Sequence, residues 1–139
     1  MFLTRDDYIV VGDSALKVLQ QSSDENRGRA EDFAREEISG YLRSRYDVGN
    51  VFSVTGDERN PVIVMYMCDI ALYHMVSWLP QRMGWEIREI RYKRAIEWLK
   101  DVQAGKTSPD ILTITGPDGE EDYNNPVRYN PGERNRYNW

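Results

Sequence analysis

Apolar residues recur at helical spacing through most of residues 1–104. In the range 24–46 they fall at i, i+3/4 and i+7/8 with charged residues on the opposite side, a pattern typical of an amphipathic helix. The expected inner face of this helix consists of Ala30, Phe33, Ala34, Ile38, Tyr41, Leu42 and Arg45. Two shorter helices are expected before it: one from Thr4 to Gly12, where the glycine ends it, and one that begins at Asp13 or Ser14.

The range 60–79 is apolar on nearly every side, which is typical of a helix in the centre of a protein. Asn60 followed by Pro61 is a helix start signal. A last helix is expected over 85–104, followed by Gly105. Its expected inner face consists of Ile87, Ile90, Arg91, Arg94, Ala95, Trp98, Leu99 and Val102. Residues 47–59 are expected to be a connector. The pattern predicts an all-α fold: a small helical bundle of two short N-terminal and three longer helices, with helix 60–79 packed between the other two long ones.

The composition changes at Gly105, which we take as the end of a helical domain over 1–104. Residues 105–139 hold four of the six prolines and only four aliphatic side chains, too few to offset an ordering cost of about 1–2 kcal/mol per residue. We therefore expect an extended C-terminal arm, with a short strand or hairpin near 111–123 as an open alternative. Its candidate partner-binding residues are Tyr123, Tyr129, Arg134, Arg136, Tyr137 and Trp139, types that are enriched in protein interfaces.

Candidate catalytic residues are few. His74 is the only histidine and Cys68 the only cysteine, and six residues of helix place them on different faces. We expect both to be packed side chains, and we expect no enzymatic activity. No spacing typical of metal ligands or of a phosphate-binding loop occurs, so neither a metal nor a cofactor is expected. Asp69, an acid inside an apolar helix, should pair with Arg45, Arg91 or Arg94, and we favour Arg45 or Arg94.

Charge and residue usage point towards a part of an assembly. Lys and Arg number 18 and Asp and Glu 23, which gives a net charge of −5 and disfavours a compact module that grips nucleic acid by its phosphates. No run of 18 apolar residues occurs, so no membrane span is expected. A single cysteine fits a reducing compartment. Arginine far outnumbers lysine, and the chain has nine tyrosines and four tryptophans. Arginine, tyrosine and tryptophan are the residue types that most often carry the binding energy at protein interfaces.

Four phrases of the sequence together resemble one family. They are the opening Met-Phe-Leu-Thr-x-x-Asp, then Ile38–Tyr46 (ISGYLRSRY), Cys68–Tyr73 (CDIALY) and Arg91–Gly105 (RYKRAIEWLKDVQAG). In this order and spacing, over roughly residues 1–105, the chain is similar to the small head–tail adaptor proteins of tailed bacteriophages and Mu-like prophages.

The resemblance implies a structural virion protein, made in the host cytoplasm and located in the virion neck. Such a subunit forms a ring, usually a dodecamer, beneath the portal protein, carries a stopper or tail-completion protein, and lines part of the DNA exit channel. The arm of such adaptors commonly reaches the portal. An acidic wall agrees with DNA that passes through without specific binding, because phosphate-binding arginines would retard it. The residues leave an alternative open: a small helical regulatory or adaptor module that binds a single protein partner.

Overall fold

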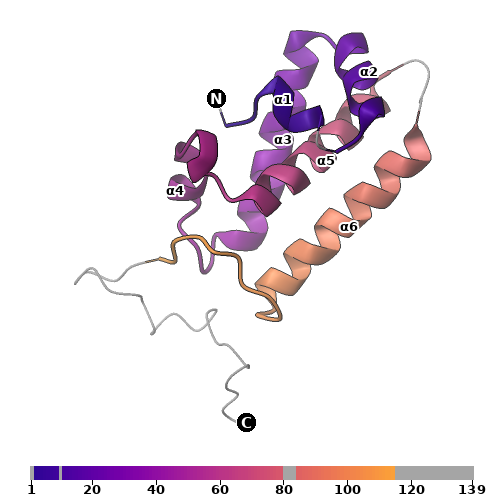
Figure 1. Ribbon diagram of the computed structural model, residues 1–139. Coiled ribbons are helices and arrows are strands. Elements are labelled where there is room, and N and C mark those ends of the chain that lie inside the picture. Colours follow the sequence, from indigo (N-terminus) through magenta and orange to yellow (C-terminus); the bar gives the residue numbers. More distant parts are fainter. Residues whose placement is uncertain (1, 10, 80–83, 115–139) are drawn as a thin grey trace.

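The computed structural model describes residues 2–9, 11–79 and 84–114, and Figure 1 shows that this part of the chain is a bundle of helices. The elements are α1 (Arg5–Ile9), α2 (Asp13–Gln21), α3 (Asp24–Leu42), α4 (Val48–Ser53), the 3₁₀ helix η1 (Gly56–Glu58), α5 (Pro61–Ser77) and α6 (Trp85–Gln103). The described residues form no strand, and Tyr46 and Thr113 make an isolated antiparallel bridge. The predicted all-α bundle, with two short N-terminal and three longer helices, is confirmed. The alternative hairpin would extend beyond Ile114, outside the described residues.

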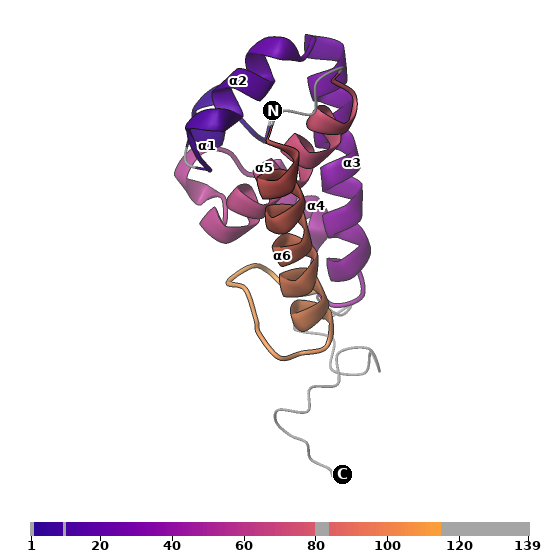
Figure 2. The same cartoon turned by 90° about the vertical axis from the view of Figure 1, so that its right-hand side faces the viewer.

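Helix α5 is the centre of the bundle, as its apolar sequence predicts. It packs against α1, α2, α3 and α6. Figure 2 shows it between the α1–α2 pair and α3, behind α6. Its fully buried aliphatic side chains include Ile63, Ile70, Leu72 and Val76. Each such side chain contributes about 1.5–3 kcal/mol when it is removed from water, so α5 supplies much of the stability of the bundle.

Helix α6 runs antiparallel to α5. Tyr66, near the start of α5, contacts Trp98 near the end of α6, with ring centroids 5.1 Å apart. Tyr73, near the end of α5, contacts Trp85 at the start of α6 at 5.0 Å. The first residues of α5 and of α6 therefore lie at opposite ends of the molecule, which matters for the surfaces described below.

The helix boundaries follow the signals in the sequence. The Asn60 side-chain oxygen accepts hydrogen bonds from the backbone N–H groups of Val62 and Ile63, at 3.0 and 3.1 Å, and Pro61 is the first helical residue. Gly105 follows α6 with φ of +81°, a left-handed conformation that glycine adopts without strain. Its N–H donates to the Val102 carbonyl at 3.1 Å.

The connector predicted over 47–59 contains two short helices that the sequence pattern did not predict, α4 and η1. The Asp47 carboxylate caps α4 by accepting from the Asn50 N–H at 3.2 Å. Val51 and Phe52 turn into the core and are 3% and 8% exposed. A helix of six residues is too short to show a periodic pattern, so tertiary burial decides its formation.

The inner face predicted for α6 is wrong in its rotation. Ala95, Leu99 and Val102 are buried as expected, but the first turn buries Arg88 in place of its neighbours. Ile87 and Ile90 are 44% and 54% exposed, and Arg94 is exposed as well. Burial of Arg88 beside Asp69 turns the start of α6, and the two isoleucines then face outward. The inner face predicted for α3 is also wrong at one position, because Phe33 is 49% exposed.

The first residues after α6 fold back onto the bundle. The Asp47 N–H donates to the Leu112 carbonyl at 2.9 Å, and the Ile114 N–H donates to the Arg45 carbonyl at 3.0 Å. Ile111 packs against the hydrophobic core. The expected arm thus begins with a docked segment, and its division from the domain at Gly105 stays a prediction. No helix among the described residues is long and apolar enough to cross a membrane.

Candidate functional site

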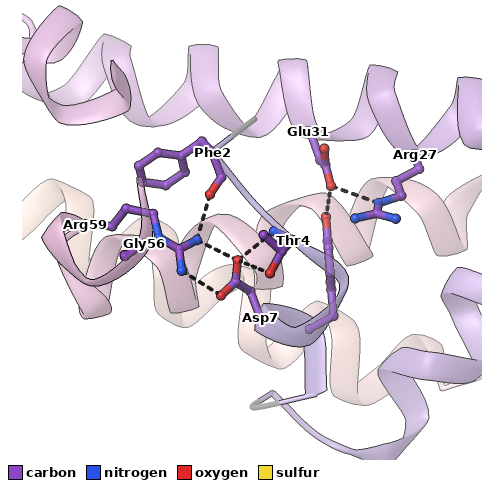
Figure 3. Close-up of polar contacts among 8 residues, drawn as sticks. Phe2, Thr4, Asp7, Arg27, Glu31, Gly56 and Arg59 are labelled. Atoms are coloured by element: carbon purple, nitrogen blue, oxygen red, sulfur yellow. Dashed lines mark hydrogen bonds and ion pairs between the residues drawn. The ribbon is translucent and has the colours of Figure 1, made fainter. Parts of the chain in front are cut away.

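The opening phrase of the sequence forms a clasp between the N-terminus and the start of α5 (Figure 3). The Arg59 guanidinium donates to both carboxylate oxygens of Asp7, at 2.6 and 3.0 Å, and to the Phe2 carbonyl at 2.6 Å. Its Nε donates to the Gly56 carbonyl at 2.8 Å. Asp7 also accepts from the Thr4 N–H at 2.7 Å, which is one half of a capping box at the start of α1. We call these residues (Phe2, Thr4, Asp7, Gly56 and Arg59) the N-terminal clasp.

Electrostatics favour an ionised Asp7 in the clasp. Burial raises the pKa of Asp7, but hydrogen bonds and attraction from Arg59, together with the Thr4 N–H, outweigh burial and lower that pKa below 3.8. The two side chains are only 14% and 12% exposed. The two charged groups of the clasp, Asp7 and Arg59, are paired with each other. The motif therefore holds α1 against the start of α5.

A second polar contact ties α1 to α3 beside the clasp. The Tyr8 hydroxyl donates to a Glu31 carboxylate oxygen at 2.5 Å, and the Arg27 Nε donates to the same oxygen at 3.1 Å. Burial and the adjacent Glu31 raise the pKa of Tyr8 well above its ordinary value. Tyr8 therefore stays a neutral hydrogen-bond donor.

Asp69 lies in a buried polar cluster between α5 and α6. The Arg91 Nε donates to Asp69 at 2.7 Å, so the expected arginine partner is confirmed, but the preference for Arg45 or Arg94 is wrong. Burial raises the pKa of Asp69, although Arg91, Arg88 and Arg94 counteract this effect. Arg88 is 2% exposed, and burial lowers its pKa while Asp69 counteracts it. The cluster is accordingly a structural ion pair whose charges are expensive to bury.

The histidine and the cysteine do not form a catalytic pair in this arrangement. His74 Nε2 lies 2.5 Å from a Glu37 oxygen, and the Tyr92 hydroxyl donates to the other Glu37 oxygen at 2.8 Å. Burial raises the pKa of Glu37, but the hydrogen bonds from His74 and Tyr92 lower it overall. Cys68 is fully buried, and burial raises the pKa of its thiol far from the range where a thiolate nucleophile forms. The packed character expected for Cys68 is confirmed, and His74 is a partly exposed link between α3, α5 and α6.

An open groove of about 640 Å³ lies between α4, η1, the start of α5 and residues 110–112. We call it the α4–α5 groove. Its apolar lining residues are Val51, Val54, Pro61, Val62, Ile111 and Leu112. Three exposed acids, Asp57, Glu58 and Asp110, also line it, and its one cation, Arg59, is held in the clasp. The groove thus offers apolar surface with a negative border.

Large apolar side chains are exposed at two further places. Phe33 on α3 and Trp78 at the end of α5 contact each other with ring centroids 6.0 Å apart, and they are 49% and 40% exposed. Ile87 and Ile90 stand on the first turns of α6 with Arg94 one turn further along the same face. We call Ile87, Ile90 and Arg94 the α6 ridge. Sequence periodicity assigned Phe33 and the three residues of the α6 ridge to the core, and only the packing shows them at the surface.

The arm residues proposed for partner binding lie outside the described residues. These are Tyr123, Tyr129, Arg134, Arg136, Tyr137 and Trp139. Within the described ranges no group of three or more histidine, cysteine or acidic side chains is arranged to hold a metal ion. The surface features that the structure does place, the α4–α5 groove and the exposed apolar residues, are therefore the candidates for function, and they suit protein partners rather than small ligands.

Comparison with known proteins gives one match. No curated protein and no solved structure matches the chain. A family model described as "Bacteriophage Mu, Gp36" matches residues 3–124 of the 139, a range that includes all of the clasp except Phe2, all six α-helices and the first part of the arm. The match agrees with the resemblance to phage proteins drawn from the four sequence phrases. The chain belongs to the bacteriophage Mu Gp36 family.

Proposed function

We propose that the protein is a head–tail adaptor: a structural virion protein that forms a ring beneath the portal, carries a stopper or tail-completion protein and lines the DNA exit channel. The observation that carries the proposal is the family match over residues 3–124, which supports a structural or morphogenesis role in a phage. The adaptor role in the neck is the more specific step, and the four phrases quoted above favour it.

The surface of the described bundle agrees with a subunit that is covered by other proteins. Seven large apolar side chains are 38% or more exposed: Ile9, Phe33, Val62, Trp78, Ile87, Ile90 and Leu112. Single exposed apolar residues are ordinary, but here they recur around a groove, on a helix ridge and in an aromatic pair. Such surfaces favour contacts on more than one side, as a ring subunit between neighbours requires.

Charge supports the same role. The net charge of −5 makes tight binding to DNA phosphates unfavourable, and a channel lining should let DNA move. A regulatory module that binds one protein partner is the alternative, and it would need only one of the exposed surfaces.

Deletion of the gene from the phage or prophage tests the proposal. We expect DNA-filled heads and free tails that fail to join, and restoration of joined particles when the protein is supplied from a plasmid. Mass spectrometry of purified wild-type particles should detect the protein at a copy number similar to that of the portal. Joined, infectious particles without the protein would refute the adaptor role, and one copy per particle would refute the ring.

A further inference from the structure

The α4–α5 groove and the α6 ridge have complementary chemistry. In the groove, Val62 and Leu112 are 38% and 59% exposed and present apolar surface. The border of the groove is acidic, and no ion pair with another described residue is formed by Asp57, Glu58 or Asp110. A partner that fills this groove must therefore bring apolar side chains together with positive charge.

The α6 ridge brings both. Ile87, Ile90 and Arg94 follow at i, i+3 and i+7, so they stand on one face of the helix. Ile87 and Ile90 are 44% and 54% exposed. Arg94 is exposed, and it forms no ion pair with another described residue; Asp69, which it attracts electrostatically, is held by Arg91. A convex helix face with one free guanidinium fits a concave apolar surface with an acidic border.

The two features are too far apart to meet within one chain. The groove lies at the Pro61 end of α5, and the α6 ridge lies beside the Tyr73 end, because α6 is antiparallel to α5. Helix α5 has 17 residues and is therefore about 25 Å long. Figure 1 shows the start of α6 and the α4 region on opposite sides of the molecule. Two different complementary patches on one chain allow head-to-tail contacts, which generate rings or open filaments.

We propose that the α6 ridge of one copy docks in the α4–α5 groove of the next copy. Closure of these joints into a ring rests on the proposed function; the joint itself does not. A short helical ridge buries less surface than a stable two-chain complex, which needs about 1,200–2,000 Å² in total. The joint is accordingly weak between two free copies and becomes stable when a closed ring engages every subunit twice.

Thiol crosslinking tests the joint directly, because the natural Cys68 is fully buried and gives little background. The variants are Leu112→Cys in the groove and Ile90→Cys on the ridge. When the two are mixed at high protein concentration and treated with a short thiol–thiol crosslinker, we expect a covalent dimer. Each variant alone should give at least about fivefold less. The matched control is Ile9→Cys, which is exposed on α1 outside both features; its mixture with Leu112→Cys should give no excess of dimer.

Charge reversal tests whether Arg94 and the acidic border face each other. Arg94→Glu on the ridge partner should lower the mixed dimer about fivefold, and so should Asp110→Lys on the groove partner. The two reversals combined should restore it. Failure of the combination to restore the dimer would refute the proposed pairing of charges.

Other occupants of the groove give different crosslinks. Dimers from Leu112→Cys alone, at the level of the mixture, would show a symmetric contact and overturn the proposal. A crosslink of Leu112→Cys to Trp139→Cys in place of Ile90→Cys would show that the arm occupies the groove, and would overturn it as well.

Purified phage particles separate this inference from the proposed function. If particles contain the protein and the mixed pair does not crosslink in them, the joint is wrong and the adaptor role stands. If the mixed pair crosslinks in purified protein and particles lack the protein, the joint stands and the adaptor role is wrong.

Discussion

Replacement of Asp7 by asparagine removes one charge from the N-terminal clasp and keeps the size of the side chain. In the wild type, Arg59 donates to both Asp7 oxygens at 2.6 and 3.0 Å, and both side chains are largely buried. Hydrogen bonds to charged groups contribute about 1.5–3 kcal/mol, and breaking a buried pair costs about 3–5 kcal/mol. The amide still offers one acceptor to Thr4 or Arg59. We therefore expect Asp7→Asn to lower the free energy of unfolding by about 2–3 kcal/mol at pH 7, a large part of a total of about 5–15 kcal/mol.

The contribution of Asp7 to the free energy of unfolding changes with pH in a definite direction. The pKa of Asp7 in the folded protein lies below 3.8, its value without these interactions. The contribution of the ionised carboxylate is thus fully present above pH 3.8 and is lost as the pH falls through the folded-state pKa. Urea unfolding followed by circular dichroism, at several pH values from 7 to 3, measures the free energy of unfolding of the wild type and the variant. The difference between wild type and Asp7→Asn should be largest at pH 7 and should shrink below pH 4.

Two matched amide variants make the experiment decisive. Glu25→Gln breaks the exposed pair with Arg29, in which the side chains are 71% and 60% exposed, and should cost less than about 0.5 kcal/mol. Asp69→Asn breaks a buried ion pair in which the carboxyl pKa is raised by burial, whereas the pKa of Asp7 is lowered. The ionised form of Asp69 is therefore disfavoured in the fold. That variant leaves Arg91 and the buried Arg88 without their carboxylate, so it should also destabilise the fold, but its cost should fall rather than rise between pH 3 and pH 7. If Asp7→Asn costs no more than Glu25→Gln, or if its cost is the same at pH 3 and pH 7, the ion pair between Asp7 and Arg59 does not stabilise the fold.

Three further outcomes are expected. Ile70→Asp should abolish cooperative thermal unfolding, because an unpaired charge at a fully buried position costs several kcal/mol, and an unchanged melting curve would contradict the central place of α5. Cys68 should react with a thiol reagent only in denaturant, whereas rapid reaction of the native protein would show that it is accessible. Removal of residues 115–139 should leave the melting temperature of the bundle unchanged and weaken incorporation into phage particles, and equal incorporation of the shortened chain would show that Tyr129 and Trp139 are not needed for binding.

Local signals in the sequence determined the helices and most of their ends. Asn60-Pro61 and Gly105 act through backbone geometry and through caps within a few residues, so no tertiary contact is needed to read them. The apolar character of 60–79 likewise determined that this helix would be central, because such a surface is stable only when other helices cover it on every side.

The rotation of α6 and the partner of Asp69 were decided by tertiary structure. On a helix with apolar residues on two sides, either side can face the core, and periodicity does not distinguish them. The choice depends on where Asp69 on α5 meets an arginine, and the packing selected Arg91 and buried Arg88, which left Ile87 and Ile90 outside. The same holds for the α4–α5 groove, whose walls come from segments about fifty residues apart in the chain. Surfaces of that kind arise only when distant segments pack together, and the exposed Phe33, Ile87 and Ile90 are residues that the sequence pattern had assigned to the core.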